Sequence, residues 1–294
     1  MEHNGNLSPA RPSRRRILMR RLGAVVVAVL VIGGLAAALA LRGSSRAAAP
    51  PTTTIRQLRQ FRVLFPEGFT RAAMADRVQA VAKIARHEAH RKVKLSGKAY
   101  LAATKGPRVI PGFGSKRHLE GFLFPDTYDF DRSSTSEQLV REQLREFAGN
   151  WNTLNLSYAR SKNLTPYDVL TIASMVEGEA QVPKERPLVA AVIYNRLHAG
   201  MPLQIDATTR YGLHIPPTQS LTNADLNSDN PYNTRNRPGL PPTPINNPGL
   251  ASLEAAAHPA HVDYLYFVRK PDHKHHYFTS DYQDFLRHEA QYGY

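Results

Sequence analysis

The chain has 294 residues, of which 42% are hydrophobic and 21% are charged, a composition typical of a folded protein with one large or two modest domains. Cysteine is absent, which excludes disulfides, thiol nucleophiles and zinc-thiolate sites. The formal net charge of +14 indicates an anionic partner or neighbourhood, and nucleic acid, anionic lipid and an anionic cell envelope all meet that requirement.

An arginine-rich segment directly precedes a long apolar run near the beginning of the sequence. Residues 1–21 are polar and basic, and residues 22–41 contain no ionisable group. A run of about 20 apolar residues can span a bilayer and exceeds the roughly 7 to 15 of a signal-peptide core. We therefore expect a cytoplasmic tail (1–21), a single-pass transmembrane helix in the cell membrane (22–41) and an extracytoplasmic remainder. A cleaved signal peptide is the alternative, since four of residues 36–40 are alanine, a small residue typical of cleavage sites.

The basic cluster needs no nucleic acid to explain it, because it adjoins the predicted span and the rest of the chain mixes both signs of charge. Residues 42–60 are rich in Pro, Thr and small residues and are expected to form an extended linker. The next segment, 61–105, begins with an alternating strand and a turn, and Thr70 can cap the helix that follows. This opening resembles a LysM-like module, a small glycan-binding fold.

Residues 106–132 are rich in turns, and the segment LEGFLFPDTYDF (119–130) gathers aromatic residues around Glu120. Aromatic rings offer apolar faces on which sugars stack, although such a cluster is equally typical of a core loop. Thr135 with Gln138 predicts the start of a helix whose apolar residues recur at helical spacing.

A helix is predicted from Thr165, the N-cap, to about Ala180. Glu177 continues its apolar face, whereas Glu179 is expected to point the other way. A carboxyl group sheltered from water favours its neutral form and can act as a general acid, which is the role we expect for Glu177. The alternative is a surface ion pair with Lys184 or Arg186.

A second helix is predicted from Pro187 to Gly200, packed against the first as a hairpin. Residues 216–248 are dense in Pro, Asn and Gly, and long ordered loops of this kind often carry binding or catalysis. A short helix (252–257), two strands (264–268 and 276–279) and a last helix (282–291) complete the chain. The histidines of 273–276 lack further metal ligands nearby in sequence, so we expect no metal site and no cofactor.

Five ordered segments together resemble the membrane-anchored endolytic murein transglycosylases of the YceG-like family. They are EGFLFPDTY (120–128), IASMVEGEA (172–180), YNRLHAGMPLQIDATTRYG (194–212), YNT with GLPPTPINNPG (232–249), and YLYFV with HYF (264–278). The chain departs from the family pattern at several positions, among them Gly178 and Ala207. The resemblance implies an α+β fold, with the YceG-like catalytic domain at 106–294.

The resemblance also implies functional residues. Glu177 matches the position expected for the catalytic glutamate. The candidates for substrate contacts are Asn195, Gln204, Asp206, Thr208, Tyr232 and Asn233, followed by Glu120 and His276.

The reaction implied is non-hydrolytic cleavage of the bond between N-acetylmuramic acid and N-acetylglucosamine in peptidoglycan strands, which leaves a 1,6-anhydro end and ends strand growth. Peptidoglycan synthases are the implied protein partners. A hydrolytic muramidase would need a second carboxyl group, for which Asp206 and Glu179 are nearest in sequence, although we expect Asp206 to bind substrate. The other alternative is a noncatalytic anchor that holds glycan strands and recruits wall-synthesis proteins.

Overall fold

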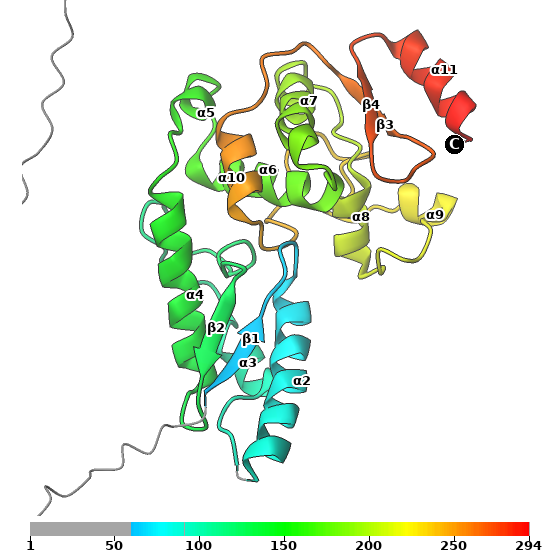
Figure 1. Ribbon diagram of the computed structural model, residues 1–294. Coiled ribbons are helices and arrows are strands. Elements are labelled where there is room, and N and C mark those ends of the chain that lie inside the picture. The colour runs from blue at the N-terminus through cyan, green and yellow to red at the C-terminus, as the bar shows by residue number, and fades with distance from the viewer. Residues whose placement is uncertain (1–59, 91, 294) are drawn as a thin grey trace, which may run out of the picture. The chain divides into compact units, whose positions relative to one another are not determined.

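The computed structural model describes residues 60–90 and 92–293 (Figure 1). Its first strand, β1 (Phe61–Leu64), pairs antiparallel with β2 (Thr127–Phe130), so that Phe61 lies opposite Phe130. Helices α2 (Arg71–Ala89) and α3 (Gly97–Ala103) lie between these strands in sequence, and α4 (Ser136–Trp151) follows them. Together these elements enclose one of two apolar cores.

The predicted N-caps of two helices around this core, α2 and α4, are confirmed. The Thr70 side chain accepts the N–H of Ala73 at the start of α2, and Thr135 with Gln138 forms a capping box on α4. The core extends beyond residue 105, because β2 supplies the partner strand of β1 and α4 contributes buried side chains. The segment 61–105, predicted as a separate module, therefore contains the first strand and two helices of a β–α–α–β arrangement whose closing strand lies at 127–130.

The second core surrounds helix α6 (Pro166–Glu179), which begins with the predicted capping box of Thr165 and Asp168. Ten of its 14 residues are buried, so the helix is enclosed on nearly all sides rather than on one apolar face. The elements around it are α5 (Ser157–Ser161), the 3₁₀ turn η1 (Pro183–Glu185), α7 (Arg186–His198) and α10 (Leu250–Ala257). Helices α10 and α7 both pack on α6, which confirms the predicted helix pair.

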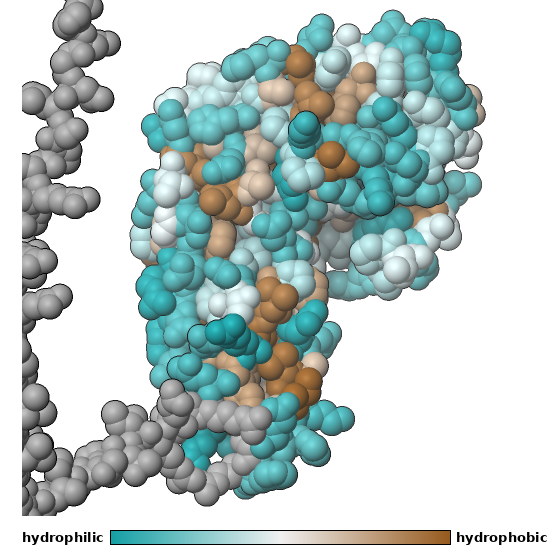
Figure 2. Space-filling model, viewed as in Figure 1, coloured by the Kyte–Doolittle hydropathy of each residue, from teal (hydrophilic) through white to brown (hydrophobic). Residues whose placement is uncertain are grey.

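The remaining elements surround the C-terminal end of α6. Helix α8 (Asp206–Leu213) contacts α6, and the short α9 (Asn223–Leu226) lies within the long polar loop. Strands β3 (Tyr266–Arg269) and β4 (His276–Thr279) form a hairpin that packs on α11 (Tyr282–Tyr292) (Figure 1). The α+β class is thus confirmed, with two small antiparallel sheets among the described residues. The visible surface over α8, α9 and α11 is largely hydrophilic (Figure 2).

The predicted tail (1–21), the predicted transmembrane helix (22–41) and all but the last residue of the predicted linker (42–60) lie outside the described residues. Within the part that is described, none of the helices combines the length and the apolar character needed to cross a bilayer.

A single buried asparagine joins the two cores. Asn247 is fully buried, and its Oδ1 accepts hydrogen bonds from the N–H groups of Gly121 and Leu123, both at 2.9 Å. Its Nδ2 donates to Phe69 O and to Glu120 Oε1, also at 2.9 Å. One side chain therefore satisfies polar groups from the turn before α2 and from the loop before β2.

We expect Asn247→Ala to lower the free energy of unfolding by about 3 kcal/mol, because it leaves several buried groups without a partner. Urea denaturation measures this loss, and Asn236→Ala is the matched control. Asn236 is exposed, and its side chain makes one long hydrogen bond, of 3.4 Å to Ser228 O, so truncation to Ala should change stability by less than about 0.5 kcal/mol. Equal stabilities of the two variants would contradict the joining role of Asn247.

Candidate functional site

A groove of about 790 Å³ opens at the C-terminal end of α6. It is bounded by the Gly68–Thr70 turn, the end of α6, the segment 203–211, strand β3 and helix α11. Its charged side chains come from six elements or loops. They are Glu179, Arg196, Asp206, Arg210, Arg235, Arg269 and Glu289. A polar groove of this size fits a hydrophilic ligand larger than one sugar ring.

Glu179, the last residue of α6, is the buried acid of this groove. Only 8% of the residue is exposed, and its Oε1 accepts the N–H of Ala207 in the first turn of α8 at 3.2 Å. Burial raises the pKa of Glu179, and the nearby charge of Asp206 raises it further. The hydrogen bond from Ala207 and the charges of Arg269 and Arg210 oppose that increase in pKa. Glu179 is therefore placed to hold a proton in a site open to ligand.

Glu177 faces a different environment two residues earlier. Its Oε2 accepts the N–H of Gly249 at 3.1 Å and the hydroxyl of Ser252 at 2.7 Å, both at the start of α10. Its Oε1 lies 3.9 Å from Arg186 Nη2, and only 8% of the Glu177 side chain is exposed. The carboxylate thus acts as an acceptor that satisfies the N-terminus of α10, beside a positive charge.

The structure corrects the expected directions of these two side chains. Glu177 does not line the groove, whereas Glu179, which we expected to face elsewhere, does. The helical periodicity was right in placing the two carboxyl groups on different sides of α6. The error lay in the assumption that only one side of α6 is apolar, because burial on nearly all sides shelters both carboxyl groups.

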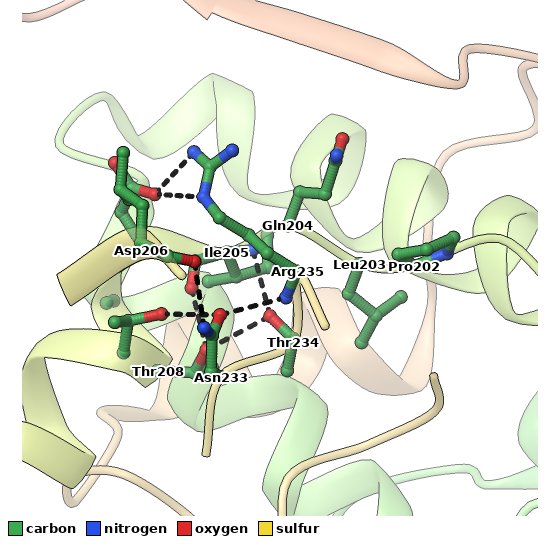
Figure 3. A network of polar contacts seen from close by, with 12 residues as sticks. Pro202, Leu203, Gln204, Ile205, Asp206, Thr208, Asn233, Thr234 and Arg235 are labelled. Carbon is green, nitrogen blue, oxygen red and sulfur yellow. Dashed lines mark hydrogen bonds and ion pairs between the residues drawn. The ribbon is translucent and has the colours of Figure 1, made fainter. Parts of the chain in front are cut away.

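Gln204 and Asp206 line the groove as expected (Figure 3). Gln204 is exposed, has a positive φ of 57°, and accepts a hydrogen bond from Arg196 Nη1 at 3.1 Å. Asp206 begins α8, and its Oδ1 accepts from Arg235 Nη2 at 2.7 Å and from Arg235 Nε at 3.2 Å. Both polar side chains are therefore available to substrate at the groove wall.

Four other candidates form hydrogen bonds within the segments that make up the groove wall. Thr208 and Asn233 are fully buried; Thr208 bonds to Ile205 O and Thr234, and Asn233 donates to two carbonyls of the long loop (Figure 3). Asn195 donates to the carbonyls of Val262 and Tyr264, which fixes the approach to β3. The hydroxyl of Tyr232 lies 2.9 Å from that of Thr243. The hydrogen bonds of these four side chains lie within the protein and connect the segments that form the groove wall.

The two remaining candidates are both buried titratable groups. The imidazole of His276 lies 2.8 Å from Glu185 Oε2 and reaches the groove wall; burial lowers its pKa, and the Glu185 hydrogen bond opposes that decrease. Glu120 is 7% exposed and accepts hydrogen bonds from Arg71 N, Asn247 Nδ2 and the Tyr211 hydroxyl. Burial raises the pKa of Glu120 to about 7, although those hydrogen bonds lower it.

Glu120 should make stability depend on pH. The unfolded carboxyl titrates near 4.5 and the folded one near 7, so the folded state binds the proton more tightly. Stability is then greatest below about pH 4.5 and falls by about 3 kcal/mol as the pH rises to about 7. We expect Glu120→Gln to remove that part of the decrease in urea denaturation measured at several pH values. Identical pH dependence in the two proteins would contradict this effect.

Some groove residues could not be identified as site residues from the sequence. Arg210, Arg235 and Arg269 are surface-type residues whose convergence depends on how α8, the long loop and β3 pack. Asn246 lines the same wall, and its buried Oδ1 lacks a hydrogen-bond partner within residues 60–90 and 92–293. Gly178 allows a close approach, because a Cβ there would lie 3.0 Å from the Ala207 Cβ. Gly178 and Ala207, two of the positions at which the chain departs from the family pattern, thus lie next to each other.

Among the described residues, no group of three or more His, Cys, Asp or Glu side chains is placed to hold a metal ion. Two histidines of the β3–β4 hairpin contact different carboxylates, since His275 contacts Asp272 and His276 contacts Glu185.

A buried carboxyl group in an open polar groove is the arrangement of an acid–base site, and comparisons with known proteins identify the family. The model of the YceG-like family matches residues 44–291, so the chain belongs to that family. An "endolytic murein transglycosylase" of Streptococcus pneumoniae is 33% identical over 247 residues, 77% of this chain and 43% of the relative. One of Bacillus subtilis is 40% identical over 156 residues, 53% of this chain and 43% of the relative.

The crystal structure of a yceG-like protein from Listeria monocytogenes is similar to this fold. It is 31% identical, with a TM-score of 0.64, over 77% of this chain and 75% of that chain. The chain spans less than half the length of the curated relatives it matches.

Proposed function

We propose that the protein is a lytic transglycosylase that cleaves peptidoglycan strands internally, between N-acetylmuramic acid and N-acetylglucosamine, with Glu179 as the catalytic carboxyl group. The observation that carries this proposal is the position of Glu179, a desolvated acid with a raised pKa at the wall of a polar groove. The names of the relatives, which are endolytic murein transglycosylases, support the same substrate class. Glu179 replaces Glu177, whose carboxylate is engaged at the start of α10.

One carboxyl group can serve both halves of the reaction. Protonated Glu179 donates its proton to the glycosidic oxygen as the bond to C1 of the muramoyl residue breaks. The resulting carboxylate accepts the proton of the C6 hydroxyl of the same residue, and that oxygen closes on C1 to give the 1,6-anhydro end. The attacking hydroxyl belongs to the substrate, so no water needs to be positioned.

Asp206 has a supporting electrostatic role in this proposal. Its negative charge adds to the effect of burial in raising the pKa of Glu179, which favours the protonated form that the reaction requires. Arg235 holds Asp206 with two hydrogen bonds, so Asp206 is less suited to activate a water molecule as a hydrolase would require. A muramidase would release products heavier by one water, and mass spectrometry separates the two outcomes.

We expect Glu179→Gln to lower the release of anhydromuropeptides from purified sacculi by about 10² to 10⁴-fold, because the amide cannot donate the proton. The assay uses the chain without its first 42 residues, with products identified by mass spectrometry. Glu177→Gln is the matched control, since it changes the other carboxyl group of the same helix turn. That variant should keep activity within about tenfold and lose mainly stability.

The opposite pattern, in which Glu177→Gln is inactive while folded and Glu179→Gln is active, would return catalysis to Glu177. An inactive parent protein that still binds sacculi would instead favour the noncatalytic anchor. Circular dichroism of each variant establishes that it is folded.

The pH dependence of the reaction should report on Asp206. Activity falls as the pH rises through the pKa of Glu179, because the acid must be protonated. Since the charge of Asp206 raises that pKa, we expect Asp206→Asn to move the falling limb of kcat/KM to lower pH. A limb that stays in place or moves to higher pH would contradict the electrostatic role of Asp206.

We further propose that residues 22–41 anchor the chain in the cell membrane, with the groove on the extracytoplasmic side, as the arginines before this segment indicate. The β–α–α–β arrangement around β1 and β2 supports a LysM-like contribution to holding glycan strands. Ending of nascent strands alongside peptidoglycan synthases remains the corresponding cellular role in this proposal.

A further inference from the structure

Arg269, the last residue of β3, differs from the other arginines that line the groove. Three of them are engaged: Arg196 donates to Leu203 O and neighbouring carbonyls, Arg210 donates to Pro216 O, and Arg235 pairs with Asp206. The guanidinium of Arg269 makes no hydrogen bond or ion pair with any residue in 60–90 or 92–293. It is thus an unpaired cation at the wall of the groove.

The position of Arg269 is fixed by its strand. In the β3–β4 register Arg269 lies opposite His276, whose imidazole is buried against Glu185. The charge of Arg269 lowers the pKa of Glu179, so the guanidinium acts on the same space as the catalytic carboxyl group. A rigid strand therefore presents an unpaired positive charge beside the site of cleavage.

The carboxyl groups of the groove do little to neutralise the positive charge of Arg269. Among the groove carboxyl groups, Asp206 is held by Arg235, Glu179 accepts the N–H of Ala207 and is buried, and Glu289 makes no ion pair with Arg269. A guanidinium presents a planar fork of donors that matches the two oxygens of a carboxylate. The free partner that best fits this place is a carboxylate carried by the substrate.

We propose that Arg269 binds a carboxylate of the peptide stem attached to a muramoyl residue next to the scissile bond. This inference rests on the proposed function and adds a substrate class, since the groove then selects glycan strands that carry acidic stems over strands from which the stems have been removed. The muramoyl residue is the sugar that bears the stem, so a stem carboxylate and the reacting C1 enter the groove together. The contact orients the muramoyl residue toward Glu179.

The test compares two substrates that differ only in their stems: uncrosslinked glycan strands with intact peptides, and the same strands after an amidase has removed them. The quantity measured is the ratio of kcat/KM for the first to kcat/KM for the second. We expect Arg269→Ala to lower this ratio about tenfold, as for loss of a charge-assisted hydrogen bond in a partly exposed groove, and Arg269→Lys to lower it less. Because Arg269 also affects the pKa of Glu179, the ratio at one pH cancels that effect.

Lys270→Ala is the matched control, because Lys270 is the adjacent cation and does not line the groove. It should leave the ratio unchanged. An unchanged ratio in both Arg269 variants, or an equal loss in Lys270→Ala, would overturn the proposal.

A binding measurement separates failure of this inference from failure of the proposed function. In a Glu179→Gln background, isothermal titration with a stem-bearing muramoyl tetrasaccharide should show about tenfold weaker binding when Arg269 is also changed to Ala. Such a loss of affinity supports the stem contact. If the parent protein cleaves neither substrate, that result refutes the proposed transglycosylase activity and leaves the stem contact supported. Equal affinity of the single and double variants for the tetrasaccharide would overturn the stem contact while leaving catalysis by Glu179 untouched.

Discussion

The C-terminal end of α6 holds two carboxyl groups, and each meets the N-terminal turn of another helix. Glu177 accepts the N–H of Gly249 before α10, and Glu179 accepts the N–H of Ala207 in α8. The difference between them lies in what else is near: Arg186 and Ser252 for Glu177, Asp206 and the open groove for Glu179. Burial of one central helix therefore yields one carboxylate that stabilises the fold and one acid that is placed for chemistry.

The same packing connects the small core to the groove. Asn247 holds the turn before α2 and the loop before β2, and it donates to Glu120. Glu120 in turn accepts the hydroxyl of Tyr211, which lines the groove from α8. A chain of hydrogen bonds thus runs from the β1–β2 unit to the groove wall, through Asn247, Glu120 and Tyr211.

The sequence predicted most of the regular elements, because capping residues such as Thr70, Thr135 and Thr165 act locally on the helices that follow them. It also predicted Gln204 and Asp206 as groove residues, through the family resemblance. It could not predict which α6 carboxyl group faces the groove, since periodicity fixes the angle between Glu177 and Glu179 but not which elements cover each side. The groups around Arg269 converge from distant segments, and only the packing brings them together.

The ionisation of Glu179, the acid that we propose for the groove, can be observed directly. Carbon NMR of protein labelled at glutamate carboxyl carbons follows each titration, with Glu179→Gln and Glu177→Gln used to assign the signals. We expect a carboxyl group whose pKa lies above the usual value near 4.5 and whose signal disappears in Glu179→Gln. Titration of Glu179 at or below that value would contradict it.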